Sequence, residues 1–248
     1  MDADGQNALS KLLESEQRRL HLICYKNFEQ VADTARLEKL KDDKKSFRFY
    51  KTEYGEFPSV TTIIDPEFKA WCSEEELKIA TSEGNIHHAL ASEYIKTGKW
   101  VEYNQLDGVA NDLMNLKGIV LTPWDFPKFL EKYPLKNMKN GRILINKALK
   151  YAGTNDGECL YPIDGLKDAE LVPTIFDFKR TPDRDKNFTQ MAAYASCEGM
   201  EHIKQMMVIP TGSDTVQGFS KPIITSAISK YQEVFAEKRK AFSITYGV

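Results

Sequence analysis

Long apolar runs are missing from this sequence, and their absence excludes a first class of protein. No stretch approaches the roughly 18 to 20 consecutive apolar residues that a membrane-spanning helix needs. The opening residues, MDADGQNALSKLLESE, are acidic and have neither a signal-type apolar core nor an arginine-rich leader. We therefore expect a cytoplasmic protein with no membrane partner.

Cysteine is scarce, and the motifs of several familiar enzyme classes are absent. The chain has no G-x-x-x-x-G-K-[ST] phosphate loop, G-x-G-x-x-G fingerprint, G-x-S-x-G elbow or H-E-x-x-H pair, which excludes the most easily recognised nucleotide-binding, hydrolase and zinc-protease classes. No C-x-x-C pair or local Cys/His cluster occurs, so we expect reduced thiols and no iron–sulfur cluster. The cysteines are Cys24, Cys72, Cys159 and Cys197.

Strong overall charge is also missing. The 248 residues carry 34 Lys and Arg against 36 Asp and Glu, and a formal net charge of -2 is not typical of a chain that binds polyanions over its whole surface. Any such binding must depend on local basic charge. One window breaks the balance, because residues 132–155 contain no Asp or Glu but hold Lys132, Lys136, Lys139, Arg142, Lys147 and Lys150.

Apolar residues recur at helical spacing in several segments. Gly84 interrupts one of them, so two helices or one kinked helix are expected there, with the second beginning near Gly84. The expected helices cover residues 8–45, 74–95, 106–116, 124–133, 188–200 and 223–242.

Strand-like patterns lie mainly between these helices. Residues 47–58 alternate aromatic and polar side chains around the turn at Tyr54-Gly55 and predict a hairpin or an extended segment. An antiparallel meander is expected from residues 142–153, 158–163 and 171–180, followed by a short buried strand over 205–210. This order of elements predicts an α/β or α+β fold.

The strand TIFDFKR, residues 174–180, carries the first candidate chemistry. Side chains alternate between the faces of a strand, so Asp177 and Lys179 should lie side by side. Asp156 follows small, turn-prone residues on the preceding arm, and two carboxylates from adjacent strands can converge on Mg²⁺ or Mn²⁺. Such a cation activates water and neutralises a scissile phosphate. Alternatively, D-x-K is a strand with a cross-face salt bridge, which is the commoner meaning of a lone D-x-K.

Further motifs stand in order along residues 58–194. They are PSVTTII, Trp71, EGNIHHALASEYIKTG, AGTND, FDFKR and Q-M-A-A-Y. Together they resemble the PD-(D/E)XK nuclease superfamily in its RecB-like and phage exonuclease branch. The resemblance implies a restriction-endonuclease-like core, with a mixed central sheet flanked by helices, over residues 46–248. Residues 1–45 would form a helical N-terminal extension.

The resemblance implies a metal centre and a catalytic lysine. Asp156 and Asp177 would be metal ligands, with Phe178 contributing its backbone carbonyl, and Lys179 would be the catalytic lysine. The histidine that follows the motif glycine by four residues is His88, an implied third ligand that suits Mn²⁺ well. Without the resemblance, a histidine on an amphipathic helix is more often a packed or surface residue.

Other matched positions are implied to act on water or on DNA. Gln190 would position water or the substrate strand, together with Tyr194, although periodicity alone places Tyr194 in the core. Ser59, Thr61 and Thr62 match a segment close to the bound strand in relatives, and hydroxyls are good phosphate donors. Their alternative role is a Ser/Thr turn beside a strand edge. Trp71 is either a stacking platform or a core residue.

Three positions depart from the family pattern. Asn146 stands where many relatives carry a glutamate, so an additional metal position is not expected from it. Asn155 replaces an apolar residue before Asp156, and Glu158 follows closely, which bears on the choice of metal.

These motifs lead to a hypothesis of function with alternatives. We expect a metal-dependent DNA exonuclease that acts on single strands or strand ends, in the host cytoplasm if the chain is phage-encoded. Lys136, Lys139 and Arg142 are the expected phosphate contacts. A nuclease-fold DNA-binding or recombination module with weak or no turnover, and a structure-specific endonuclease, are the alternatives. Some relatives form rings, so an oligomer is compatible with the resemblance.

Overall fold

The computed structural model describes residues 23–27, 46–66, 72–106, 110–212 and 218–248. The chain divides into two compact units. The first comprises the described parts of Met1–Pro66 together with Ile145–Gly153 and Ala236–Val248, and the second those of Glu67–Leu144 and Thr154–Phe235.

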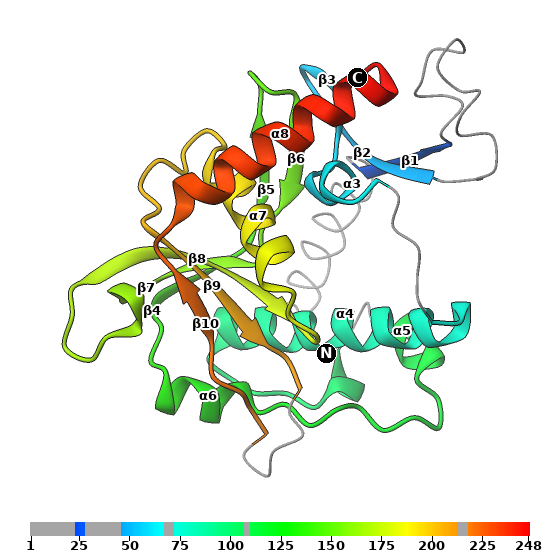
Figure 1. Cartoon of the computed structure of the whole chain (residues 1–248). Helices are drawn as coiled ribbons and strands as arrows, with labels where there is room; N and C mark the ends of the chain where they lie inside the picture. The colour runs from blue at the N-terminus through cyan, green and yellow to red at the C-terminus, as the bar shows by residue number, and fades with distance from the viewer. Residues whose placement is uncertain (1–22, 28–45, 67–71, 107–109, 213–217) are drawn as a thin grey trace, which may run out of the picture. The chain divides into compact units, whose positions relative to one another are not determined.

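The first unit contains a three-stranded antiparallel sheet of order β1-β2-β3 (Figure 1). Its strands are β1 (Ile23–Asn27), β2 (Ser46–Thr52) and β3 (Gly55–Pro58), so the hairpin expected over 47–58 is confirmed. Phe47 of β2 packs against Phe242 and Tyr246 near the end of α8 (Ile228–Tyr246), with ring centroids 5.9 and 5.1 Å away. These aromatic contacts form part of the core of this unit.

The helix expected over residues 8–45 is wrong at Ile23–Asn27, which is strand β1. Its isoleucine, cysteine and tyrosine suit an extended backbone, and pairing with β2 supplies the hydrogen bonds that a helix would otherwise provide. The other residues of that range lie outside the described part of the chain. The domain boundary between residues 45 and 46 stays a prediction.

The second unit is built on a five-stranded mixed sheet of order β10-β9-β8-β7-β4 (Figure 1). β8 and β9 are parallel and are joined through α7, whereas the other neighbours are antiparallel. Helices flank the sheet, which confirms the expected α/β (α+β) fold class with a mixed central sheet. The strands are β4 (Lys136–Asn140), β7 (Gly157–Pro162), β8 (Leu171–Lys179), β9 (Gln205–Pro210) and β10 (Ile223–Thr225).

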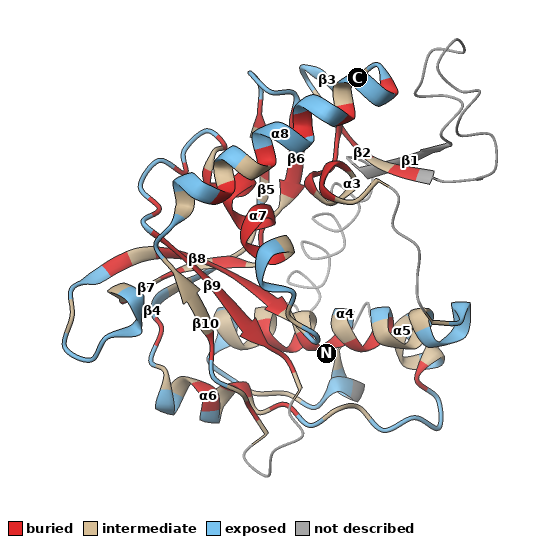
Figure 2. Ribbon diagram, in the orientation of Figure 1, coloured by how far each residue is buried: buried red, intermediate tan, exposed pale blue. Residues whose placement is uncertain are grey.

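Aromatic side chains fill one side of this sheet. Phe176 and Phe178 of β8 pack with Phe126 and Phe129, which belong to α6 (Phe126–Lys132), and with Ala91 of α4 (Glu74–Thr97). On the other side α7 (Arg184–Ala195) contacts β8 and β9. Figure 2 shows that β8 and β9 are buried along most of their length. Because the aromatic residues of β8 are buried on one side, the residues between them point to the other side of the sheet.

Three further expectations need correction. β7 pairs with β4 and β8, and β5 (Ile143–Asn146) pairs only with β6 (Tyr151–Thr154) among the described strands, so the three segments do not form one continuous meander. α4 runs unbroken through Gly84, and the two-helix alternative is wrong. The C-terminal helix begins at Ile228, because Ile223–Thr225 pair with β9 as β10.

Four short helices complete the described structure. No helix in the described ranges, long or short, is long and apolar enough to cross a membrane. The short helices are α3 (Val60–Ile64), α5 (Ala110–Asn115), η2 (Tyr103–Gln105) and η3 (Ile163–Gly165).

Candidate metal and phosphate site

Two carboxyl groups meet at one end of β8 in the second unit. Asp177 lies on β8, and Asp156 lies directly before β7, the antiparallel neighbour of β8. Oδ2 of Asp156 accepts a hydrogen bond of 2.7 Å from the backbone N–H of Phe178. The two carboxyl groups are close enough for the charge of Asp156 to raise the pKa of Asp177. The structure therefore brings the two aspartates together, as the adjacency of their strands predicts.

Backbone contacts hold the turn that carries Asp156. The N–H of Gly141 donates to the carbonyl of Asp156 at 2.9 Å, and the N–H of Arg142 donates to Oδ1 of buried Asn155 at 2.8 Å. A Cβ at Gly141 would lie 1.7 Å from the carbonyl oxygen of Asn155, so only glycine permits this approach. Asn155 thus fixes the position of the neighbouring aspartate.

Two cationic or ionisable groups flank the carboxyl pair. Nζ of Lys179 lies 2.7 Å from Oδ2 of Asp177; the side chain of Lys179 is 27% exposed and that of Asp177 is 2% exposed. On the other side, Nδ1 of His88 lies 3.4 Å from Oδ1 of Asp156. The predicted neighbours Asp177 and Lys179 do lie side by side, and α4 brings His88 to the same place.

The environment separates the pKa values of the two aspartates. Burial raises the pKa of Asp177 above its usual range, and nearby Asp156 adds to this, while Lys179 opposes it. Burial also acts to raise the pKa of Asp156, but His88 and Lys179 outweigh it and hold that pKa below its usual range. For His88, burial is outweighed by Asp156, which raises the pKa of the imidazole. Asp177 is therefore the carboxyl group of the pair that takes up a proton first as the pH falls.

The donor set fits a hard divalent cation held by two carboxylates. Oδ2 of Asp177 is buried, and beyond its ion pair with Lys179 no described donor gives it a well-directed hydrogen bond. Mg²⁺ is often held by one or two carboxylates, with water and substrate phosphate completing its shell. Across the described ranges, no group of three or more His, Cys, Asp or Glu side chains is arranged to hold a metal ion. The roles of His88 and of the Phe178 carbonyl as ligands stay predictions.

Packing around Phe178 fixes the end of β8. Its ring lies 5.5 Å from the rings of Trp124, Phe126 and His88, in edge-to-face arrangements. Because successive strand residues point to opposite faces, anchoring Phe178 on this side directs Asp177 and Lys179 to the other. The aromatic core and the candidate site are thus two faces of the same strand.

Gln190 and Tyr194 contact each other on α7. Nε2 of Gln190 donates a hydrogen bond of 3.0 Å to the Tyr194 hydroxyl, and both side chains are buried. The burial of Tyr194 agrees with the alternative that it is a core residue. Their action on water or on a substrate strand stays a prediction.

Ser59, Thr61 and Thr62 belong to the first unit and form a hydroxyl cluster. Oγ of Ser59 accepts the backbone N–H of Thr62 at 3.1 Å and thereby caps α3, while the Arg48 guanidinium donates to the Thr61 hydroxyl at 2.6 Å. Ser59 is fully buried, which agrees with the turn alternative for this residue. Trp71 lies outside the described residues.

Asn146 has a local role in its hairpin. Its Oδ1 accepts the N–H of Leu149 at 2.9 Å, and its Nδ2 donates to the Tyr151 hydroxyl at 3.2 Å. The amide therefore stabilises the turn between β5 and β6.

Exposed cations lie along the sheet edge formed by β4. Lys136 and Lys139 are exposed on that strand, and exposed Arg142 follows it. A register shift between Lys136 and Lys139 interrupts the pairing with β7. Lysines and a bulge on an edge strand both discourage pairing with another strand, which gives Lys136 and Lys139 a structural role. Contact of Lys136, Lys139 and Arg142 with DNA stays a prediction.

An ion pair between a buried glutamate and an exposed arginine, which the sequence did not reveal, anchors the residue after Lys179. Oε2 of Glu83 on α4 lies 2.8 Å from Nε of Arg180, and Oε1 accepts the backbone N–H of Thr122 at 2.6 Å. His87, one turn further along α4, is buried against Trp124, and burial lowers its pKa to about 4. Because Glu83 and His87 are four residues apart, the sequence predicts that they share a face of the helix. No pattern in the sequence predicts that Glu83 pairs with Arg180.

Comparison with known proteins places the chain in no family. No protein-family model matches it, and no curated protein matches it.

Proposed function

We propose that this chain is a divalent-metal-dependent deoxyribonuclease that hydrolyses phosphodiester bonds through an activated water, as an exonuclease on single-stranded DNA or strand ends. The observation that carries the proposal is the meeting of the carboxyl groups of Asp156 and Asp177 at one end of β8, with Nζ of Lys179 2.7 Å from Oδ2 of Asp177. A carboxyl group as deeply buried as that of Asp177, beside a second one at Asp156, is costly for a fold unless a cation or a proton lies between them. A cation site accounts for keeping both.

Each residue of the site has a distinct task in this proposal. Asp156 and Asp177 would hold Mg²⁺ or Mn²⁺, which when bound lowers the pKa of a water ligand and offsets charge on the scissile phosphate. The partly exposed ammonium of Lys179 orients the attacking water and donates to the phosphate as negative charge develops. The N–H of Phe178 and the ring of His88 keep Asp156 in place.

A cleavage assay tests the proposal. Single- and double-stranded DNA labelled at one end is incubated with the full chain in Mg²⁺ or Mn²⁺, beside Asp177→Ala and Lys179→Ala. We expect metal-dependent shortening from one end, and a loss of about 100-fold or more in rate for each variant, as for removal of a catalytic acid–base or charge-stabilising group. Glu131→Gln, at an exposed position of α6, is the control for a change of one charge.

The other outcomes separate the alternatives. DNA binding without metal-dependent cleavage would contradict the enzyme and favour a binding or recombination module. Discrete internal products would indicate a structure-specific endonuclease.

A further inference from the structure

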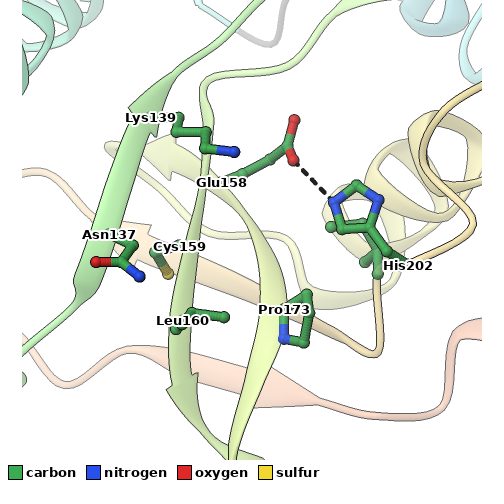
Figure 3. A pocket seen from close by; sticks show the side chains of 8 residues that line it. Asn137, Lys139, Glu158, Cys159, Leu160, Pro173 and His202 are labelled. Carbon is green, nitrogen blue, oxygen red and sulfur yellow. Dashed lines mark hydrogen bonds and ion pairs between the residues drawn. The ribbon is translucent and has the colours of Figure 1, made fainter.

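A small hollow lies on the sheet of the second unit, beside the edge strand β4. Its volume is about 180 Å³, and residues of β4, β7 and β8 and of the segment before β9 line it (Figure 3). Leu160 and Pro173 give it an apolar surface, whereas Lys139, Glu158 and His202 supply its charged and polar groups.

The carboxylate of Glu158 lies within a set of basic groups. Its Oε2 is 3.1 Å from Nε2 of His202, and its Oε1 is 3.6 Å from Nε of Arg142. Lys139 stands directly opposite Glu158 in the β4–β7 pairing, and Figure 3 shows its amine on the side of the carboxylate. The Glu158 side chain is 13% exposed, whereas those of Arg142 and His202 are about half exposed. Glu158 therefore occupies a site that is built for an anion.

This anion site shares a face of the sheet with the carboxyl pair. Lys139 is paired with Glu158, and Glu158 with Ile175 of β8. Directly opposite residues lie on the same face, as do residues two apart on a strand, so Asp177 belongs to that face too. The cations around Glu158 are thus about two residues along the sheet from the proposed cleavage site.

We propose that Glu158 occupies the place of a DNA backbone phosphate, and that a phosphate of the substrate strand displaces it from Arg142 and His202, beside Lys139. This inference rests on the proposed function, because it supplies a second phosphate contact beside the scissile one. A guanidinium and an imidazole that contact the same carboxylate, with an ammonium group on the same side, match a phosphate, which makes more hydrogen bonds than a carboxylate does. The adjoining hollow gives room for the sugar or base attached to that phosphate. A strand that has not displaced Glu158 is held less tightly near the carboxyl pair.

Binding without divalent metal tests this displacement. Fluorescence anisotropy of a labelled oligo(dT) is measured against the full chain in EDTA over a series of salt concentrations. Glu158→Gln keeps the shape of the side chain but removes its charge, so binding should tighten about five-fold, the size of a partly exposed charge contact. Arg142→Gln and His202→Gln should each weaken binding, and Arg142→Gln should reduce the salt slope by about one. Glu131→Gln, on the helix that covers the opposite face, is matched in charge and should leave binding unchanged.

The binding results separate displacement of Glu158 from its absence, and the phosphate site from the nuclease. Equal or weaker binding by Glu158→Gln, or an equal gain in Glu131→Gln, would overturn the displacement. If Glu158→Gln does not fold, unchanged binding by both Arg142→Gln and His202→Gln would overturn it instead. Tighter binding by Glu158→Gln in a chain that never cleaves DNA would leave the phosphate site standing and refute the nuclease. Metal-dependent cleavage by the chain, with DNA binding unchanged in all of these variants, would support the nuclease and overturn the phosphate site.

Discussion

Replacing Glu83 should loosen the end of β8, because this side chain joins α4 to the residue after Lys179. In Glu83→Ala the backbone N–H of Thr122 loses an acceptor at 2.6 Å, and Arg180 loses a partner at 2.8 Å. Glu83→Gln keeps an oxygen in reach of Thr122 but removes the charge that faces Arg180. The two variants therefore separate the hydrogen bond from the ion pair.

The structure sets the expected size of each effect. A buried donor left without an acceptor costs about 1–3 kcal/mol. Arg180 is 44% exposed and can turn toward water, so its share is about 1 kcal/mol or less. Glu83→Ala should lower the free energy of unfolding by about 2–3 kcal/mol, and Glu83→Gln by about 1 kcal/mol.

Urea unfolding followed by tryptophan fluorescence measures this difference, because Trp124 packs within the same cluster beside His87. Equal losses for the two substitutions would mean that the hydrogen bond from Thr122 adds nothing measurable to stability. A loss below about 0.5 kcal/mol for Glu83→Ala, the range of ordinary surface changes, would refute the anchoring role altogether.

Two further changes test the geometry around the site. Gly157→Ala should destabilise the protein by about 1–3 kcal/mol, because a Cβ there would lie 2.2 Å from Cζ of Phe176 and 2.5 Å from the carbonyl oxygen of Lys139. In Gly84→Ala the added Cβ has no atom within 4 Å, so this variant should be more stable by about 0.5–1 kcal/mol. Equal melting temperatures for Gly157→Ala and Gly84→Ala would contradict both expectations. Tyr194→Phe leaves the Gln190 amide without its acceptor and should cost about 1 kcal/mol. If Gln190 positions water, the single-turnover cleavage rate should fall as well, and an unchanged rate would limit Gln190 to packing.

The sequence predicted those elements whose structure depends on neighbouring residues in the chain. The hairpin of β2 and β3, the pairing of β7 with β8 and the buried strand β9 each follow from alternation or from a short apolar run between turns. β4 was missed, since KNMKN is polar and contains residues that disfavour strands; it forms because β7 offers an unpaired edge. The helix assigned to Ile23–Asn27 failed for a similar reason, because pairing with β2 outweighs a weak helical pattern.

The same division applies to the candidate site. Asp177 and Lys179 could be placed together from the two-residue period of one strand, and Asp156 from the neighbouring strand. Glu158 could be noticed only as a departure, because His202 approaches it from 44 residues away in the chain. No periodic signal connects residues so distant, and only the sheet pairing and the segment before β9 bring them together.

In the proposed function, Asp156 and Asp177 together hold the divalent cation that DNA cleavage requires. Electron paramagnetic resonance of Mn²⁺ measures this directly, because the signal of free Mn²⁺ falls as the ion binds. We expect the full chain to bind Mn²⁺ and Asp156→Asn/Asp177→Asn to lose that binding while remaining folded. Equal binding by the double variant, or no binding by the unmodified chain in the presence of DNA, would contradict it.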